Sequence, residues 1–247
     1  MSIFKRWWFW GIIIAVVIII AIVGSGPNDS KPAELSSNTA VSDNLPSEIE
    51  NKQEDKQNDK SEITKPESSS FVNTAVATEL FTGEFIVGKD IKPGRYVITC
   101  KSGSGNLIVY DGETPYINEV LNSPFEKSLG LGVTKIEVDL IEGQVIQISG
   151  LNNVSFEPAV IEPKTTLPSG YHLVGRDVLA GNYIATAPQG SGNFVVYDKN
   201  GMPKVNEILG KDDFGLSVEK IKFSVKNGDV IYISGIEVVE LNKLDNY

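Results

Sequence analysis

An internal duplication limits the fold of this chain more than any other feature of its 247 residues. The segment Gly83–Asp111 aligns with Gly170–Asp198 at an offset of 87 residues, and 14 of the 29 aligned positions are identical. The similarity continues between Asn118-Glu119 and Asn206-Glu207, and then between KIEVDLIEGQVIQISG and KIKFSVKNGDVIYISG. The offset changes only where surface loops would tolerate insertions. The chain therefore contains two copies of one unit of about 75 residues, and its fold has to be one that can be built twice.

Each copy has the pattern of short β-strands. In KIEVDL, Ile136, Val138 and Leu140 alternate with Glu137 and Asp139, so the apolar residues are predicted to face the core and the acidic residues the solvent. KIKFSV repeats this alternation, and RYVITC, NLIVYD and QVIQISG add further strands bounded by Gly, Pro, Asn or Asp. No segment of either copy shows helical spacing. This pattern predicts small antiparallel β-sandwiches of the jelly-roll kind.

Glycine-rich stretches are predicted to be turns. SGSGN at residues 102–106 and QGSGN at residues 189–193 are expected to form hairpin loops, because glycine adopts positive φ at little cost. A dinucleotide-binding fingerprint is excluded, since no helix follows and its third glycine is missing. In VGKDIKPGRYVIT at residues 87–99, a turn is expected at Lys92-Pro93-Gly94. The second copy has Ala180 in place of the proline but keeps the glycine.

The N-terminus is predicted to be a membrane anchor. Trp7–Val23 contains no charged residue, and 17 helical residues at about 1.5 Å each span most of a roughly 30 Å hydrocarbon core. Lys5 and Arg6 precede this run, which favours a cytoplasmic N-terminus and an extracellular remainder. A cleaved signal peptide is the alternative, with Val23-Gly24-Ser25 as its weak cleavage site. The anchor is preferred, because the apolar run is longer than a usual signal core and no A-x-A motif follows it.

Residues 25–79 are predicted to be a disordered acidic linker. Ser, Asn, Glu, Lys, Asp and Pro dominate this segment, which cannot bury enough apolar area to offset the entropy of ordering. As a flexible chain it would reach about 40 Å. Residues 1–24 carry two of the 22 basic residues and none of the 32 acidic ones, so the rest carries 20 against 32, a net charge of −12. This charge argues against a nucleic-acid partner.

The expected domain organisation follows from these segments. The fold class is all-β, with two tandem small antiparallel β-sandwich (jelly-roll-like) domains at residues 80–160 and 167–243. They come after an N-terminal transmembrane helix in residues 1–24 and the linker in residues 25–79.

The repeated motif also resembles a known class of module. The pattern V-G-x-D-[IV]-x-x-G-x-Y, followed by G-S-G-N-x-x-V-Y-D, N-E-[IV]-L and G-x-V-I-x-I-S-G, is similar to repeat modules of uncharacterised membrane-anchored or secreted proteins of Gram-positive bacteria. More distantly, it resembles the small jelly-roll domains that follow secreted bacterial peptidases. The resemblance covers Gly83–Leu241 and implies an envelope location. Domains of the second kind often bind calcium or matrix polymers, but no cluster in this sequence matches their metal site.

The histidine and the cysteine of this chain align with residues of the other copy that have no catalytic side chain. His172, the only histidine, aligns with Phe85, which favours a packing role. Cys100, the only cysteine, aligns with Ala187, which indicates a small buried site for an inert thiol. No cysteine and histidine recur together, so nucleophilic catalysis has no candidate pair and no enzyme activity is expected.

Repeated carboxylates are the candidates for a metal site. Asp90 and Asp111 recur as Asp177 and Asp198, and such oxygens are the ligands that calcium prefers. The alternative, which we favour, is that these side chains cap turns by accepting hydrogen bonds from their own backbone. No D-x-D-x-[DN] spacing is present. We therefore expect no cofactor, and calcium is the alternative.

Repeated tyrosines and asparagines are the candidates for ligand binding. Aromatic rings on a sheet face can stack on sugar rings, although aromatic residues in strands more often fill a core. The repeated tyrosine pairs are Tyr96 with Tyr183 and Tyr110 with Tyr197. Of these, Tyr110 and Tyr197 are kept as ligand candidates together with Asn106 and Asn193.

These observations predict a non-catalytic binding protein of the bacterial cell envelope, single-pass in the membrane, with its C-terminal part extracellular. A cell-wall glycan is the first candidate target, because two copies on one chain gain avidity on a repetitive polymer. An accessory or sensory ectodomain that contacts a membrane protein partner is the alternative. A hydrolase comes third, since each unit is too small for a deep cleft.

Overall fold

A computed structural model describes residues 71–126, 132–212 and 215–244 of the chain. These residues form an all-β structure, and they include no helix that is long and apolar enough to cross a membrane. The expected all-β class is therefore confirmed, and the sheets are open, as in a β-sandwich. The predicted transmembrane helix, and the predicted linker up to residue 70, lie outside the described residues.

The last residues of the predicted linker belong to the β structure. Asn73 donates from Nδ2 to the carbonyl oxygens of Arg95 (2.8 Å) and Ala159 (3.0 Å), and its Oδ1 accepts from the Arg95 amide (2.9 Å). The first strand then begins at Thr78. Residues 71–79 therefore differ from the predicted disordered linker, because Asn73 and β1 hold them to the first copy.

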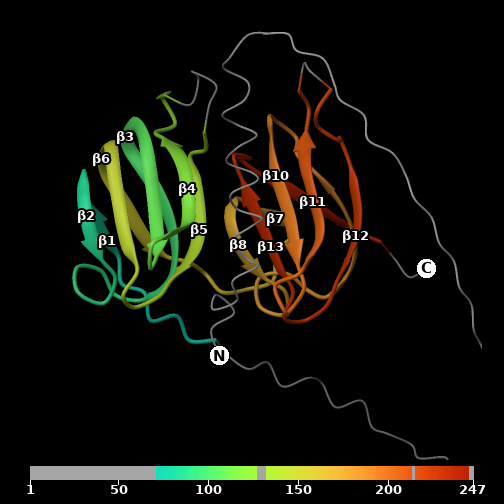
Figure 1. Cartoon of the computed structure of the whole chain (residues 1–247), viewed down its shortest axis with the longest axis horizontal. Coiled ribbons are helices and arrows are strands. Elements are labelled where there is room, and N and C mark those ends of the chain that lie inside the picture. The colour runs from blue at the N-terminus through green and yellow to red at the C-terminus, as the bar shows by residue number, and fades with distance from the viewer. Residues whose placement is uncertain (1–70, 127–131, 213–214, 245–247) are drawn as a thin grey trace, which may run out of the picture. The chain divides into compact units, whose positions relative to one another are not determined.

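The strands of the two copies follow the same order along the chain (Figure 1). Those of the first copy are β1 (Thr78–Leu80), β2 (Gly83–Ile86), β3 (Gly94–Asp111), β4 (Thr114–Asn122), β5 (Lys135–Leu140) and β6 (Val145–Pro158). Those of the second copy are β7 (Thr166–Leu167), β8 (Ser169–Leu173), β9 (Gly181–Thr186), β10 (Ser191–Tyr197), β11 (Pro203–Gly210), β12 (Ile221–Val225), β13 (Val230–Ser234) and β14 (Val239–Lys243).

Strand pairing is also the same in both copies. In the first copy, the long strands β3 and β6 pair along most of their length (Figure 1) and bind β5 and β1 at one end and β4 and β2 at the other. In the second copy each long strand is divided in two, so that β12-β9-β14-β7 and β11-β10-β13-β8 are the equivalent groups. The duplication in sequence is thus a duplication of topology.

The SGSGN stretch is a bend within a strand, and the expected hairpin loop is wrong. Residues 102–106 lie inside β3, where the register with β6 shifts between Gly103 and Asn106. The two halves of β3 pair with other strands, because β3 bends from one group to the other. Gly105 allows this bend, since a Cβ atom there would lie 1.9 Å from the Ser149 carbonyl oxygen. The glycines therefore serve close approach to β6.

The turn in the first motif lies at residues 88–90, four residues before the expected turn at Lys92-Pro93-Gly94. Gly88 donates to the Ile91 carbonyl oxygen (2.7 Å), and Asp90 Oδ2 accepts from the Ile86 amide (2.8 Å). The second copy repeats both bonds, between Gly175 and Val178 (2.7 Å) and from the Leu173 amide to Asp177 Oδ2 (2.8 Å). Gly88 and Gly175 have φ values of +95° and +97°, which explains why both copies keep glycine there.

Each copy has its own hydrophobic cluster. The first is built around Tyr96 and Phe156, and the second around Tyr183, Phe194 and Phe223. The hydroxyl of Tyr96 donates to the Lys92 carbonyl oxygen (2.8 Å), and that of Tyr183 donates to the Leu179 carbonyl oxygen (2.9 Å). These two tyrosines are therefore core residues. Their hydroxyls tie the turn before each strand to the core.

The two copies group into one compact unit. Ten strands form a continuous sheet in which β5 of the first copy pairs with β8 of the second. The domain limits at 80–160 and 167–243 stay a prediction. As expected, Ile136, Val138 and Leu140 are buried, but Glu137, expected on the solvent face, is buried too. The second copy covers this face of β5, and the candidate site lies there.

Candidate functional site at the junction of the two copies

The junction begins with a direct backbone contact between β5 and β8. The two strands run parallel, with Ile136 opposite Ser169 and Glu137 opposite Gly170. A Cβ atom on Gly170 would lie 1.9 Å from the Glu137 carbonyl oxygen, and Gly170 has a φ of +128°. Only glycine fits this position without moving one of the two strands.

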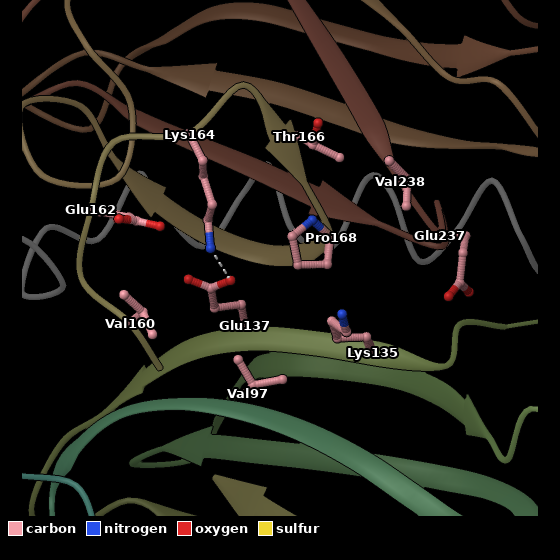
Figure 2. Close-up of a pocket in the computed structure, with 10 residues that line it drawn as sticks. All are labelled: Val97, Lys135, Glu137, Val160, Glu162, Lys164, Thr166, Pro168, Glu237 and Val238. Carbon is pink, nitrogen blue, oxygen red and sulfur yellow. Dashed lines mark hydrogen bonds and ion pairs between the residues drawn. The ribbon is translucent and has the colours of Figure 1, made fainter. Parts of the chain in front are cut away.

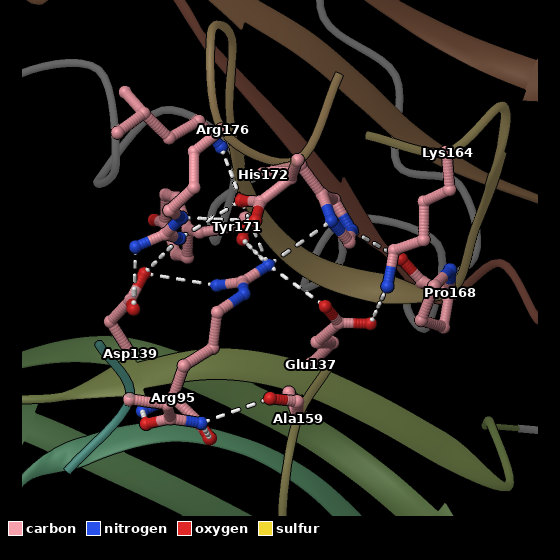
Figure 3. Close-up of polar contacts among 12 residues, drawn as sticks. Arg95, Glu137, Asp139, Ala159, Lys164, Pro168, Tyr171, His172 and Arg176 are labelled. Carbon is pink, nitrogen blue, oxygen red and sulfur yellow. Dashed lines mark hydrogen bonds and ion pairs between the residues drawn. The ribbon is translucent and has the colours of Figure 1, made fainter. Parts of the chain in front are cut away.

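Arg95 lies at the centre of the junction (Figure 3). Its side chain is 1% exposed, and its Nη2 atom lies 3.1 Å from Glu137 Oε1 and 3.0 Å from Asp177 Oδ2. Nη1 donates to Asp139 Oδ2 at 2.9 Å, and Nη2 also donates to the Tyr171 carbonyl oxygen at 3.0 Å. One guanidinium thus serves carboxylates of both copies, and the planar donor set of arginine suits this arrangement.

A second arginine completes the network from the other copy. Arg176 binds Asp139 through two nitrogens, at 2.9 Å to Oδ1 and 2.7 Å to Oδ2, and binds Asp177 through Nε and Nη2 at 2.9 Å each. Burial alone would raise the pKa of the Asp177 carboxyl, but the hydrogen bonds from Arg176 and the charge of Arg95 outweigh it and lower that pKa. The Asp177 carboxylate is therefore held ionised inside the junction.

Lys164 and His172 extend the network on its other side (Figure 3). Lys164 forms an ion pair with Glu137. His172 is fully buried, with Nε2 2.8 Å from the Pro168 carbonyl oxygen and Nδ1 3.4 Å from Arg95 Nη2. Burial and the charge of Arg95 lower the pKa of His172 to about 4, so the ring is neutral. The buried position of His172 agrees with the expected packing role. Its neutral ring can lie beside the Arg95 guanidinium, whereas a charged ring would be repelled by it.

Tyrosines and one glutamate form the other part of the junction. Tyr116 of β4 stacks on Tyr171 of β8, whose ring stacks in turn on Tyr232 of β13, with ring centroids 4.5 Å and 4.4 Å apart. Glu119 of β4 reaches across to accept from the Gly235 amide at 3.2 Å. Burial raises the pKa of the Glu119 carboxyl to about 7, against the hydrogen bonds that it receives. The Glu119 carboxyl therefore changes between its neutral and its ionised form near neutral pH.

A pocket of about 330 Å³ opens beside the ion network (Figure 2). The first copy supplies Val97, Lys135 and Glu137, the connecting segment supplies Val160, Glu162 and Lys164, and the second copy supplies Thr166, Pro168, Glu237 and Val238. Glu237 is held by Thr134, whose amide donates to its Oε2 at 2.9 Å. The lining combines both charges with apolar walls, and its size is at the lower end of that of small-molecule sites.

The predicted carboxylates do not meet in one place in the described parts of the chain. Asp90 is exposed and Asp177 is buried at the junction, although both accept the same turn hydrogen bond. Asp198 accepts from the amides of Asn200 (2.8 Å) and Met202 (2.9 Å). Asp111 lies half-buried at the end of β3. Three of the four carboxylates therefore cap turns of their own backbone.

No group of three or more His, Cys, Asp or Glu side chains in residues 71–126, 132–212 and 215–244 is arranged to hold a metal ion. The lone thiol of Cys100 is buried and donates to the Ser102 carbonyl oxygen at 2.9 Å. Burial is the main cause that raises the pKa of this thiol.

The predicted ligand residues lie on outer strand faces. Asn106 and Tyr110 alternate with the buried Leu107 and Val109, so they share the outer face of β3. Asn193 and Tyr197 lie at the equivalent positions of β10, but they share their face with the buried Val195, which lies opposite Tyr232 of the tyrosine stack. Burial raises the pKa of the Tyr197 hydroxyl. The pocket includes none of these four residues.

Apart from Asp177, the residues of the ion network are not among the predicted site residues, because the prediction rests on positions that the copies share. Arg95 aligns with Asn182, Glu137 with Lys222, Asp139 with Ser224 and Tyr171 with Glu84. Differences at single positions within closely matching segments were the available signal. Shared residues such as Asp177 and Glu119 take part in the junction as well, but its specific partners, such as Arg95 and Glu137, differ between the copies.

Comparison of the chain with protein-family models, with curated proteins and with solved structures found no match.

Proposed function

We propose that this chain is a non-catalytic, membrane-anchored binding protein of the bacterial cell envelope, with its β region outside the cell. The apolar run Trp7–Val23 after Lys5 and Arg6 supports the anchor and its orientation. The acidic linker would hold the β region away from the membrane. We further propose that each copy is a small jelly-roll-like sandwich module, which the equivalent strand pairing and the two hydrophobic clusters support.

The pocket at the junction is the observation that carries the binding proposal. It needs both copies, since Lys135 comes from β5 and Glu237 from the segment before β14. The buried ion network fixes the two copies relative to each other, so the pocket is preorganised. A lining with lysines, glutamates, valines and a proline suits a polymer segment that carries ammonium, carboxylate and apolar groups. Cell-wall polymer with peptide side chains has this chemistry.

The test is co-sedimentation of the detergent-solubilised full chain with insoluble cell wall. Lys135→Glu reverses one charge of the pocket, and its matched control is Lys199→Glu, an exposed lysine in the turn after β10. We expect saturable binding of the wild type and of the control, and at least a fivefold loss of affinity in the pocket variant, about 1 kcal/mol.

Each arm of this test has a defined meaning. Equal binding of both variants would overturn the pocket as the site, and absence of wild-type binding would overturn the wall target. Parallel samples with calcium and with chelator decide on the metal candidates Asp90, Asp111, Asp177 and Asp198. Binding that requires calcium would return them to consideration, whereas the proposal expects equal binding in both.

An accessory ectodomain that contacts a membrane protein is the second candidate function. The observation that favours it is the exposed Phe81, which lies against the half-buried Phe85, since an exposed aromatic side chain of this kind marks an interaction surface. Cross-linking in membranes that recovers one other membrane protein, with no binding to wall polymer, would support this function over the first.

A further inference from the structure

The two surfaces that meet at the junction each have a second, exposed equivalent. We define the β2 surface as Phe81, Glu84, Phe85, Lys89, Asp90, Gln147, Ser149 and Gly150, the first-copy equivalents of the second copy's joining residues. We define the β12 surface as Asn182, Ile184, Lys204, Glu207, Lys222 and Ser224, the second-copy equivalents of the first copy's joining residues. The chain thus carries one joined pair of surfaces and one further, unjoined pair.

Both unjoined surfaces include a sheet edge. β12 is the last strand of its sheet, and β2 pairs with β6 alone, so in the described residues each has one edge without a partner strand. These are the equivalents of the β5 and β8 edges that pair with each other at the junction. Gly83, at the position of Gly170, likewise presents no side chain to an approaching strand. Exposed edges of this kind invite pairing with another chain.

The β2 surface is also apolar at its centre. The Phe81 ring is 67% exposed and makes an edge contact with Phe85, with ring centroids 5.5 Å apart. Phe81 takes the position of Pro168, which at the junction shares the pocket wall with Val97. The equivalent of Val97 on the β12 surface is the half-buried Ile184. A repeat of the junction would therefore cover Phe81 with an apolar side chain.

Charges on the two surfaces are complementary. Lys204 has the position of Tyr116, and Glu84 has the position of Tyr171, so the equivalent of the stacked tyrosine pair is a lysine and a glutamate. Within its own chain Lys204 also forms an ion pair with Asp229 at 2.7 Å. Lys222 has the position of Glu137, and Asp90 has the position of Asp177, two carboxylates that Arg95 bridges at the junction. With Asn182 in place of that arginine, the exposed Lys222 can reach Asp90 directly. Two charge changes on the β12 surface, at Lys204 and Lys222, are thus matched by acidic residues on the β2 surface.

The residues of one junction contact recur unchanged in the unjoined pair. Glu119 accepts from the Gly235 amide beside Ser234, and the equivalents Glu207, Gly150 and Ser149 have the same identities. All three equivalents are exposed. In a repeat of the junction between two chains, Glu207 would accept the hydrogen bond of the Gly150 amide of the next chain.

From these features we propose that a second copy of this chain is the partner: the β2 surface of one chain docks on the β12 surface of the next and repeats the internal junction. The contact uses different surfaces on the two chains, so it continues head to tail instead of closing into a symmetric dimer. The result is a row of chains along the membrane. In each row, copies join alternately within a chain and between chains.

Cross-linking of two full-length chains tests the arrangement. Both carry Cys100→Ala, the residue of the second copy at that position, and are co-expressed with different tags. One chain carries Glu84→Cys and the other Lys204→Cys, and membranes are treated with a short bis-maleimide. We expect the mixed dimer and no dimer of either chain with itself. Tyr116→Cys with Tyr171→Cys on one chain is the matched control, which should link internally and leave the chain monomeric.

Charge exchange provides a second, independent measurement. Glu84→Lys and Lys204→Glu are each expected to weaken self-association of the full chain roughly fivefold, and the double variant is expected to restore it. Because Lys204→Glu also loses the ion pair with Asp229 of its own chain, urea unfolding of each variant is measured in parallel. The proposal is overturned if chains with Glu84→Cys link to themselves, since that shows a symmetric contact. It is also overturned if no mixed dimer forms, or if the double charge variant associates more weakly than both single ones.

Discussion

Arg95 Nη2 lies 3.0 Å from Asp177 Oδ2, and both side chains are 1% exposed, although the two residues belong to different copies of the repeat. Asp90, the first-copy equivalent of Asp177, makes the same turn hydrogen bond at 2.8 Å but is exposed. The pair of aspartates therefore separates the contribution of the turn from that of the junction.

Replacing each aspartate by alanine measures that difference. Asp90→Ala loses one turn hydrogen bond and is expected to lower the free energy of unfolding by about 1 kcal/mol. Asp177→Ala loses the same bond and also leaves the buried Arg95 without one of its carboxylates. This is expected to lower the free energy of unfolding by about a further 3 kcal/mol. Urea denaturation of both variants checks this, and equal losses would show that the ion network adds nothing to stability.

A second matched pair tests the backbone contact between β5 and β8. Gly170→Ala places a methyl group where a Cβ atom would lie 1.9 Å from the Glu137 carbonyl oxygen, whereas the nearest atom to a Cβ on Gly83 is a Phe85 ring carbon at 3.4 Å. Both glycines have positive φ, so both variants pay for backbone strain. Gly170→Ala is expected to lose several kcal/mol more than Gly83→Ala in thermal or urea unfolding. Similar losses would mean that the two strands separate at little cost.

Glu119 predicts a pH dependence of stability. Its pKa is raised from 4.5 to about 7, so the folded chain keeps a proton that the unfolded chain releases at lower pH. The stabilisation from the protonated carboxyl is fully present below pH 4.5 and is lost as the pH rises to about 7, roughly 3 kcal/mol at most. Glu119→Gln keeps an acceptor for the Gly235 amide and removes this loss. Its free energy of unfolding should equal that of the wild type near pH 4 and exceed it at pH 8.

His172 predicts the opposite slope. Its pKa is lowered from 6.5 to about 4, so the unfolded chain takes up a proton first as the pH falls. The stability due to the neutral ring is present above pH 6.5 and is lost between there and about pH 4. His172→Phe, which copies Phe85, removes this dependence. Unfolding curves at pH 7.5 and pH 4.5 should show that the variant gains on the wild type as the pH falls. A constant difference between them would contradict the buried neutral ring.

The repeat, the all-β class and most core residues could be predicted from the sequence because they depend on local patterns. The alternation of Ile136, Val138 and Leu140 identifies the inner face of β5 without reference to any other strand. The shared glycines and aspartates of the motif identify turns in the same way, although only to within a few residues. In SGSGN the glycine pattern was read as a hairpin, since sequence alone does not distinguish a loop from a strand that bends between two groups.

The junction could not be predicted, because its residues have ordinary identities for exposed strand faces. Glu137 lies between the apolar Ile136 and Val138 in the sequence, as a solvent-facing strand residue would. It is buried because β8 packs against β5. Arg95 and Arg176 are likewise unremarkable until the two copies meet. The comparison of the copies, read for differences, would have identified these positions without indicating which contacts they make.

The connection between β6 and β7 gives the junction a thermodynamic meaning. Only the residues between Pro158 and Thr166 separate the copies, so β8 is held near β5 at a local concentration in the millimolar range, by the general behaviour of short linkers. A contact too weak to unite two separate molecules is then almost always formed inside one. Joining two copies in one chain therefore keeps the junction formed at any protein concentration. The proposed contact between chains instead depends on how many chains are present in the membrane.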